Sequence, residues 1–130
     1  MRCISVRQPW AWLIIHAGKD IENRDWPTKV RGRVLIHASK GVTPNEYNEA
    51  MDFAILARRG APDEGKLIAP SFNSMQRGGI IGSVEIVDCI SASTSPWFFG
   101  KFGFVLRNPI ALPFRPFRGA LGFFDVPEAA

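Results

Sequence analysis

The feature that most constrains the fold is a series of short apolar or alternating segments separated by glycine and proline. Segments of this length and pattern, bounded by turn residues, predict short strands. The longest strictly apolar run, Trp10 to Ile15, has six residues, well short of the roughly 20 that a membrane helix needs. The clearest strand, Arg33 to Ala38, alternates between two faces. The predicted strands cover residues 3–6, 33–38, 80–88, 102–107 and 121–126.

Two helices are predicted between these strands. The first covers residues 9–17, with Pro9 at its first position and Gly18 in the left-handed conformation that ends it. The second covers residues 44–59 and begins with a capping box formed by Thr43 and Glu46. Its apolar stripe is expected to be buried. That stripe consists of Tyr47, Ala50, Met51, Ala54 and Ile55.

Proline and glycine shape the remaining segments. Pro109, Pro113 and Pro116 predict an extended crossing that can pair only at a sheet edge. The irregular stretch from 60 to 79 is expected to be a lid, a binding loop or a mobile flap. Together these patterns predict one α+β, mostly β domain over residues 1–130. We expect a small closed or half-closed barrel of about five or six strands, with the two helices at its side.

The positive charge is concentrated in one half of the chain. The net charge is +4, and residues 1–60 hold ten Lys or Arg against six Asp or Glu. Lys29, Arg31, Arg33 and Lys40 lie in a stretch without an acidic residue. Such a basic stripe either attracts phosphate polyanions or is an ordinary solvated surface.

Several classes of site are disfavoured. The candidate metal ligands Cys3, His16, His37 and Cys89 are not at ligand spacing. Phosphate-binding loops, dinucleotide fingerprints and nucleophile elbows are absent, so no metal or cofactor is expected. With two distant cysteines and no apparent leader or membrane segment, a reducing cytoplasm is expected.

The charged segment after the first helix is the strongest candidate site. Lys19, Glu22 and Arg24 can converge, because Glu22 and Arg24 share one face of an extended backbone. Such a cluster can hold a phosphate or a base edge, and a lysine beside another cation can act as base or nucleophile. We expect Glu22 to anchor one cation and to leave the other free. The alternative is an exposed ion-pair ladder.

Residues 5–39 and three later segments resemble an ASCH (activating signal cointegrator homology) domain. Lys19, Glu22 and Arg24 match the family's G-x-K-x-x-E-x-R cleft motif in spacing. The residue between the glycine and the lysine is absent here, and Ala17-Gly18 supplies the turn. The later segments that carry the resemblance are residues 77–89, 102–109 and 119–124.

The resemblance implies a PUA-like fold, with a cleft between a small β-barrel and its helices, and binding of RNA or DNA. Some bacterial members of the family are hydrolases, and ribonuclease activity also occurs within it. One branch removes acetyl groups from acetylated cytidine and has Thr where this chain has Glu22, a difference that counts against the same deacetylation here.

Further candidate binding residues lie around the motif. Arg7, Gln8 and Trp10 are at the start of the first helix, whose N–H groups and positive end favour an anion. Trp10 and Trp26 flank the charged segment, and each either stacks a base or packs at the edge of the core. His37 either points into the cleft or is a satisfied buried histidine.

The expected function is binding of nucleic acid, RNA in preference to DNA, or of a nucleotide-like small molecule, in a basic cleft. The alternative is a hydrolase acting on RNA or on a modified nucleoside, with Lys19 as base or nucleophile. Glu22 or Glu85 would then assist. Glu85 stands in an apolar strand, where it either lies in the cleft as an acid or base or faces solvent.

Overall fold

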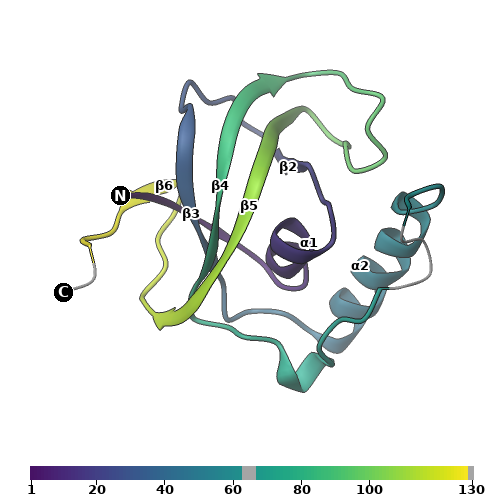
Figure 1. The fold of residues 1–130 in the computed structure, drawn as a ribbon, viewed down its shortest axis with the longest axis horizontal. Coiled ribbons are helices and arrows are strands. Elements are labelled where there is room, and N and C mark those ends of the chain that lie inside the picture. The colour runs from purple at the N-terminus through teal and green to yellow at the C-terminus, as the bar shows by residue number, and fades with distance from the viewer. Residues whose placement is uncertain (63–66, 129–130) are drawn as a thin grey trace.

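The fold is α+β and mostly β, as predicted. The computed structural model describes residues 1–62 and 67–128. One six-stranded sheet has the order β2-β5-β4-β3-β1-β6, in which β1 and β3 are parallel and the other pairs are antiparallel. Figure 1 shows the sheet curled around α1 as a half-barrel. The strands are β1 (Arg2–Val6), β2 (Ile21–Arg24), β3 (Gly32–Ala38), β4 (Gly79–Ile90), β5 (Phe102–Pro116) and β6 (Phe123–Asp125).

Apolar side chains on the inner face hold the curled sheet together. Trp26, which follows β2, makes edge contacts with Phe104 of β5 and with Phe123 of β6, at centroid distances of 5.3 and 5.9 Å. The strands β2 and β6 are the two ends of the sheet order. The aromatic cluster therefore joins the two edges of the half-barrel. The buried core around it includes Ile4, Ile14, Val34, Ile36, Val84 and Ile86.

Helix α1 (Trp10–His16) lies between the sheet and α2 (Figure 1). Its first turn is capped by the preceding glutamine, because the Trp12 N–H donates to Gln8 Oε1 at 2.9 Å. Gly18 has φ +78°, which confirms the left-handed residue predicted to end this helix. The Lys19 N–H donates to the Leu13 carbonyl at 3.2 Å. The chain thus leaves α1 in a fixed direction and enters β2.

Helix α2 (Pro44–Ala57) begins with the predicted capping box. The Thr43 side chain accepts from the Glu46 N–H at 3.2 Å, and Glu46 Oε1 accepts from the Thr43 N–H at 2.9 Å. The predicted burial of its stripe was only partly right. Ala50 and Ala54 are buried, but Ile55 is 56% exposed. Ala54 belongs to a small buried cluster with Leu13, Ala17, Ile21 and Trp97, so the helix has a narrow buried face.

The proline-rich segment continues β5 instead of leaving the sheet. Strand β2 pairs only with residues 102–105 of β5, whereas β4 pairs with β5 from Gly103 to Pro116. Beyond Leu106, whose N–H donates to the Asp20 carbonyl, no described strand pairs with the outer edge of β5, which is where prolines are tolerated. Within the 60–79 segment the structure describes a short 3₁₀ turn, η1 (Phe72–Ser74), while residues 63–66 lie outside the described residues.

Candidate functional site

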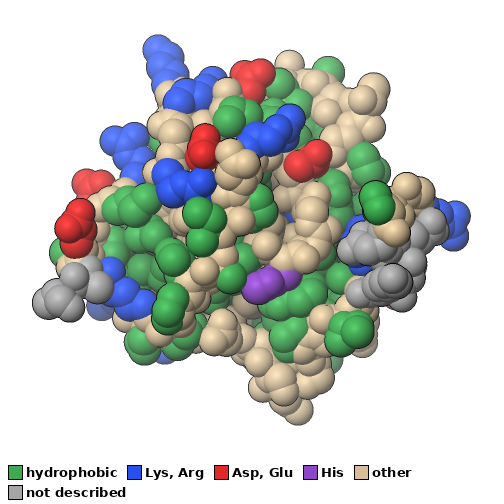
Figure 2. All heavy atoms as spheres, viewed as in Figure 1, with side chains coloured by type: hydrophobic (Ala, Val, Ile, Leu, Met, Phe, Trp, Pro, Cys, Tyr) green, Lys and Arg blue, Asp and Glu red, His purple; other side chains and the backbone are tan. Residues whose placement is uncertain are grey.

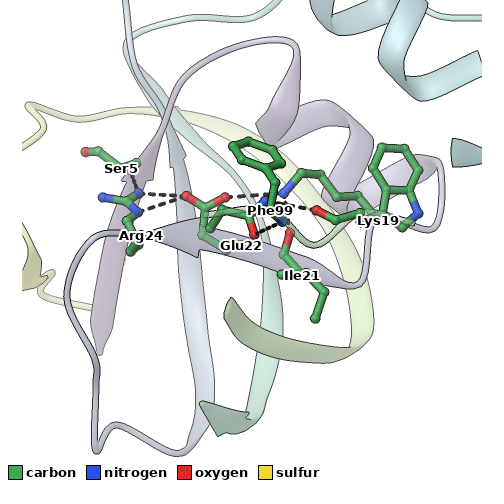
Figure 3. Close-up of polar contacts among 8 residues, drawn as sticks. Ser5, Lys19, Ile21, Glu22, Arg24 and Phe99 are labelled. Carbon is green, nitrogen blue, oxygen red and sulfur yellow. Dashed lines mark hydrogen bonds and ion pairs between the residues drawn. The ribbon is translucent and has the colours of Figure 1, made fainter. Parts of the chain in front are cut away.

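The charged residues after α1 form one compact ion cluster at the start of β2 (Figure 3). Glu22 Oε1 lies 3.4 Å from Lys19 Nζ, and Glu22 Oε2 accepts from Arg24 Nε at 3.0 Å. Arg24 Nη2 also donates to the Ser5 carbonyl at 2.6 Å. The carboxylate thus holds both cations, whereas the sequence predicted that one of them would stay free.

Lys19 is the most unusual member of the cluster because it is buried. Its side chain is 2% exposed, and Nζ donates to the Ile21 carbonyl and lies 5.6 Å from the Trp10 ring centre. Burial lowers the pKa of Lys19 below its ordinary value, while the nearby Glu22 carboxylate acts in the opposite direction. The ammonium is therefore held in place by partners and easier to deprotonate than a surface lysine.

The cluster forms part of the wall of a cavity of about 270 Å³, called here the first cavity. Its volume is close to the lower end for small-molecule sites, about 300 Å³, so it fits a group of nucleoside size. Arg7 and Trp10, two of the candidate binding residues predicted at the start of the first helix, line the same cavity. The described lining residues are Ser5, Val6, Arg7, Trp10, Lys19, Glu22, Asn23, Arg24 and Phe99.

Four of these residues, Ser5, Val6, Asn23 and Phe99, were not singled out from the sequence. The Asn23 amide donates to the Trp97 carbonyl at 2.9 Å, and its oxygen accepts from the Phe99 N–H at 3.0 Å. Phe99 is 51% exposed although it is a large apolar residue. Asn23 thus fixes the loop that carries an exposed aromatic ring to the cavity edge. The only sequence signal for this was the adjacent pair Phe98-Phe99 in a loop rich in serine.

The sequence is similar to those of known proteins. Residues 4–104 match the ASCH domain. Activating signal cointegrator 1 from Homo sapiens and from Mus musculus are 33% and 32% identical to this chain over 116 residues. The chain belongs to the ASCH domain family. The matches cover 82% of this chain and 19% of each relative, so this ASCH domain spans about a fifth of the length of those relatives.

Gln8 does not line the first cavity of this ASCH domain. It is buried, its Nε2 donates to the Gln76 carbonyl at 2.9 Å, and its oxygen caps α1. Arg7, by contrast, lies at the cavity and pairs with both Glu46 oxygens at 2.8 Å. Of these two predicted binding residues, Gln8 links segments inside the fold, and Arg7 connects the cavity wall to α2.

Trp26 and His37 also have defined partners. Trp26 packs in the aromatic cluster, and Arg24 lies 5.9 Å from its ring centre. His37 is 3% exposed: Ser5 Oγ lies 3.0 Å from Nδ1, and Nε2 lies 2.7 Å from the Phe117 carbonyl. Since a carbonyl can only accept, Nε2 donates to it. His37 is therefore buried with both ring nitrogens in polar contact, and it also lines a second, larger cavity next to the first.

The basic stripe is not one continuous patch. Lys29, Arg31 and Arg33 lie before or at the start of β3, whereas Lys40 follows its other end. Arg31 lies 3.8 Å from Asp88, and Arg33 lies 3.2 Å from Glu85. On the face shown in Figure 2, basic side chains are interspersed with acidic ones. The strand therefore divides the stripe into two groups.

Glu85 is outside the cavity that the motif forms. Its side chain is 38% exposed and accepts hydrogen bonds from Arg33 Nη2 at 3.2 Å and from Asn108 Nδ2 at 3.1 Å. Glu85 faces the outer surface at β4. Of the two alternatives drawn from the sequence, this is the one in which Glu85 faces solvent. Glu85 is not among the described residues that line the first cavity with Lys19.

Residues 1–62 and 67–128 hold neither a metal-ligand cluster nor a long apolar helix. No three His, Cys, Asp or Glu side chains in this part of the chain gather closely enough to hold a metal ion. No helix in it has the length and apolar character needed to cross a membrane.

Proposed function

We propose that this ASCH domain binds single-stranded RNA by accepting one nucleotide in the first cavity. The observation that carries the proposal is the combination of a buried ion cluster with two aromatic side chains at one cavity. Glu22 fixes Lys19 and Arg24, while Trp10 and Phe99 supply ring faces at the same opening. Unpaired bases are recognised by stacking on aromatic rings together with polar contacts to their edges.

The size of the cavity favours a single strand over a duplex. A duplex presents its bases inside the helix, whereas a cavity of about 270 Å³ requires a base that has left the stack. The exposed ring of Phe99 is consistent with this use, because a large exposed aromatic residue on a fixed loop is a ready stacking surface. The ASCH family membership supports the same class of ligand.

Phe99→Ala tests the proposal without disturbing the ion cluster. Loss of one stacking ring is worth about 1–3 kcal/mol, so affinity for a short fluorescent single-stranded RNA should fall by roughly 5- to 150-fold in an anisotropy titration. The matched control is Ile55→Ala on α2, since Ile55 is similarly exposed (56% against 51%) and lines no described cavity. Equal affinities for both variants would contradict the proposal.

Lys19 supports a second candidate function. A buried lysine with a lowered pKa, next to a carboxylate that can take up its proton, is the arrangement of a base or nucleophile. A hydrolase acting on RNA or on a modified nucleoside would use it. However, Nζ already contacts the Ile21 carbonyl and Glu22. Chromatography after incubation with modified nucleosides and RNA distinguishes the two candidate functions. Only a hydrolase forms cleavage products, and Lys19→Met should then abolish their formation.

A further inference from the structure

A second and larger cavity adjoins the first and has a different chemical character. Its volume is about 940 Å³, and it lies between the end of β3 and the segment that follows β5. Ser5 and Arg24 line both cavities, so the two meet at the Arg24 guanidinium. A ligand too long for the first cavity can therefore continue into the second.

The charged side chains that line the second cavity are all positive. Arg24, Lys40 and Arg118 line it, and no Asp or Glu is among its described lining residues. Elsewhere some exposed arginines are paired with acids, as Arg7 is with Glu46 and Arg31 with Asp88. Lys40 and Arg118 form no ion pair within the described part of the chain. This concentration of unneutralised positive charge favours an anionic ligand.

Arg24 has one part of its guanidinium available for such a ligand. Its Nε and Nη2 are used by Glu22 and by the Ser5 carbonyl, whereas Nη1 makes no hydrogen bond to the described residues. Figure 3 shows the unbonded nitrogen pointing away from Glu22. A guanidinium held on one side and open on the other is well suited to a phosphate oxygen.

The outer wall of the second cavity is fixed by the pair formed by Ser5 and His37. His37 Nε2 donates to the Phe117 carbonyl at 2.7 Å, and the Phe117 N–H donates to the Gly78 carbonyl at 3.2 Å. A Cβ at Gly119 would lie 2.8 Å from Ser5 Oγ and 2.8 Å from the His37 ring. The chain can pass this close to the pair only because residue 119 is glycine.

A second glycine lies beneath Lys40. A Cβ at Gly78, which has φ +75°, would lie 2.7 Å from Lys40 Cε, so the lysine stem rests on this glycine. The packing of its stem against Gly78 restricts where the Lys40 side chain can lie. Contact of this kind reduces the side-chain entropy lost when a ligand binds.

From these contacts we propose that the second cavity binds the phosphodiester that flanks the nucleotide held in the first cavity. The inference rests on the proposed function, and it assigns Lys40, Arg118 and Arg24 Nη1 to the backbone phosphate. Because phosphate contacts position a strand without reading its sequence, this subsite would contribute affinity and direction rather than base preference.

The test uses Lys40→Gln/Arg118→Gln, whose substituted side chains are both exposed. Affinity for a short single-stranded RNA should fall about tenfold or more, and the slope of log affinity against log salt should become shallower by roughly 1.4 for two contacts. Binding of adenosine, which has no phosphate, should be unchanged by NMR titration. The matched control is Arg2→Gln/Arg59→Gln, which removes the same charge at exposed positions outside the two cavities.

The outcomes separate the two proposals. If the variant and its control change RNA affinity and salt slope equally, the phosphate subsite is refuted. If Lys40→Gln/Arg118→Gln weakens RNA binding while Phe99→Ala does not, the second cavity binds the RNA backbone, but the nucleotide site in the first cavity is refuted and the bound phosphate does not flank it. If the unaltered protein binds no single-stranded RNA, both are refuted. Thermal melts of all variants check that they remain folded.

Discussion

Arg24 donates a hydrogen bond of 2.6 Å to the Ser5 carbonyl, although their strands are separated by three others in the sheet. The contact is possible because the sheet curls until β2 approaches β1. Arg24 therefore closes the half-barrel and, at the same time, places its guanidinium where the two cavities meet. The fold and the site depend on the same side chain.

Arg24→Lys should destabilise the protein as well as weaken ligand binding. A lysine cannot contact both Glu22 and the Ser5 carbonyl in this geometry, and a lost charge-assisted hydrogen bond costs about 1.5–3 kcal/mol. Urea unfolding measures the change. The control Arg59→Lys, at an exposed position, should stay within about 0.5 kcal/mol of the unaltered protein. Equal stability of the two variants would contradict the closing role of Arg24.

Lys19 should make the stability depend on pH in a defined direction. Its pKa in the folded protein lies below the ordinary 10.5, so between these two values only the unfolded chain binds the proton. Raising the pH through this window therefore favours the folded state, by up to about 1.4 kcal/mol per pH unit. Lys19→Met removes the effect. Urea unfolding from neutral pH towards pH 10 measures the free energy of unfolding of both proteins. As the pH rises, that of the unaltered protein should increase relative to that of Lys19→Met. A constant difference between the two would refute the prediction.

The two cysteines should differ in reactivity. Burial raises the pKa of Cys3 to about 12 and its side chain is inaccessible, whereas Cys89 is partly exposed. Since the thiolate is the reactive form, a thiol reagent at mildly alkaline pH should modify one cysteine in the folded protein and both after unfolding. In Cys89→Ser no fast reaction should remain. Fast labelling of Cys3 in that variant would mean that β1 opens readily.

The capping box of α2 gives a third stability prediction. Thr43→Ala removes the acceptor for the Glu46 N–H and should cost roughly 0.5–2 kcal/mol. Calorimetry or urea unfolding measures the loss. Thr94→Ala, at an exposed position in the loop before β5, is the matched control and should have little effect. A loss no larger than that of the control would show that the cap contributes little.

Local sequence signals predicted the parts of the fold that depend on local physics. Thr43, Pro44 and Glu46 predicted where α2 begins, because Thr43 and Glu46 accept hydrogen bonds from backbone N–H groups of the first turn. Gly18 predicted where α1 ends, because glycine readily adopts the left-handed conformation after the last turn. The spacing of Lys19, Glu22 and Arg24 likewise predicted one charged cluster.

The remaining features of the fold and of the site could not be predicted from local sequence, because they depend on how distant strands pair. The continuation of β5 through Pro109 and Pro113 depends on which strand edge is unpaired, and this follows from the short length of β2. Phe99 reaches the first cavity through its hydrogen bond to Asn23, 76 residues away in sequence. Arg118 and Lys40 line the same cavity because the ends of β3 and β5 pair with the same residue of β4, Gly79. None of these pairings leaves a local pattern in the sequence.

The central claim is that a base enters the first cavity, and the indole N–H resonances of the tryptophans test it most directly. Trp10 lines that cavity, whereas Trp12, in the same helix, lies tilted against His16 with 5.1 Å between the ring centres and lines neither cavity. During titration with a short single-stranded RNA, the ¹H–¹⁵N signal of Trp10 should shift and saturate while that of Trp12 stays in place. An unmoved Trp10 signal at an RNA concentration that saturates binding by anisotropy would contradict the account.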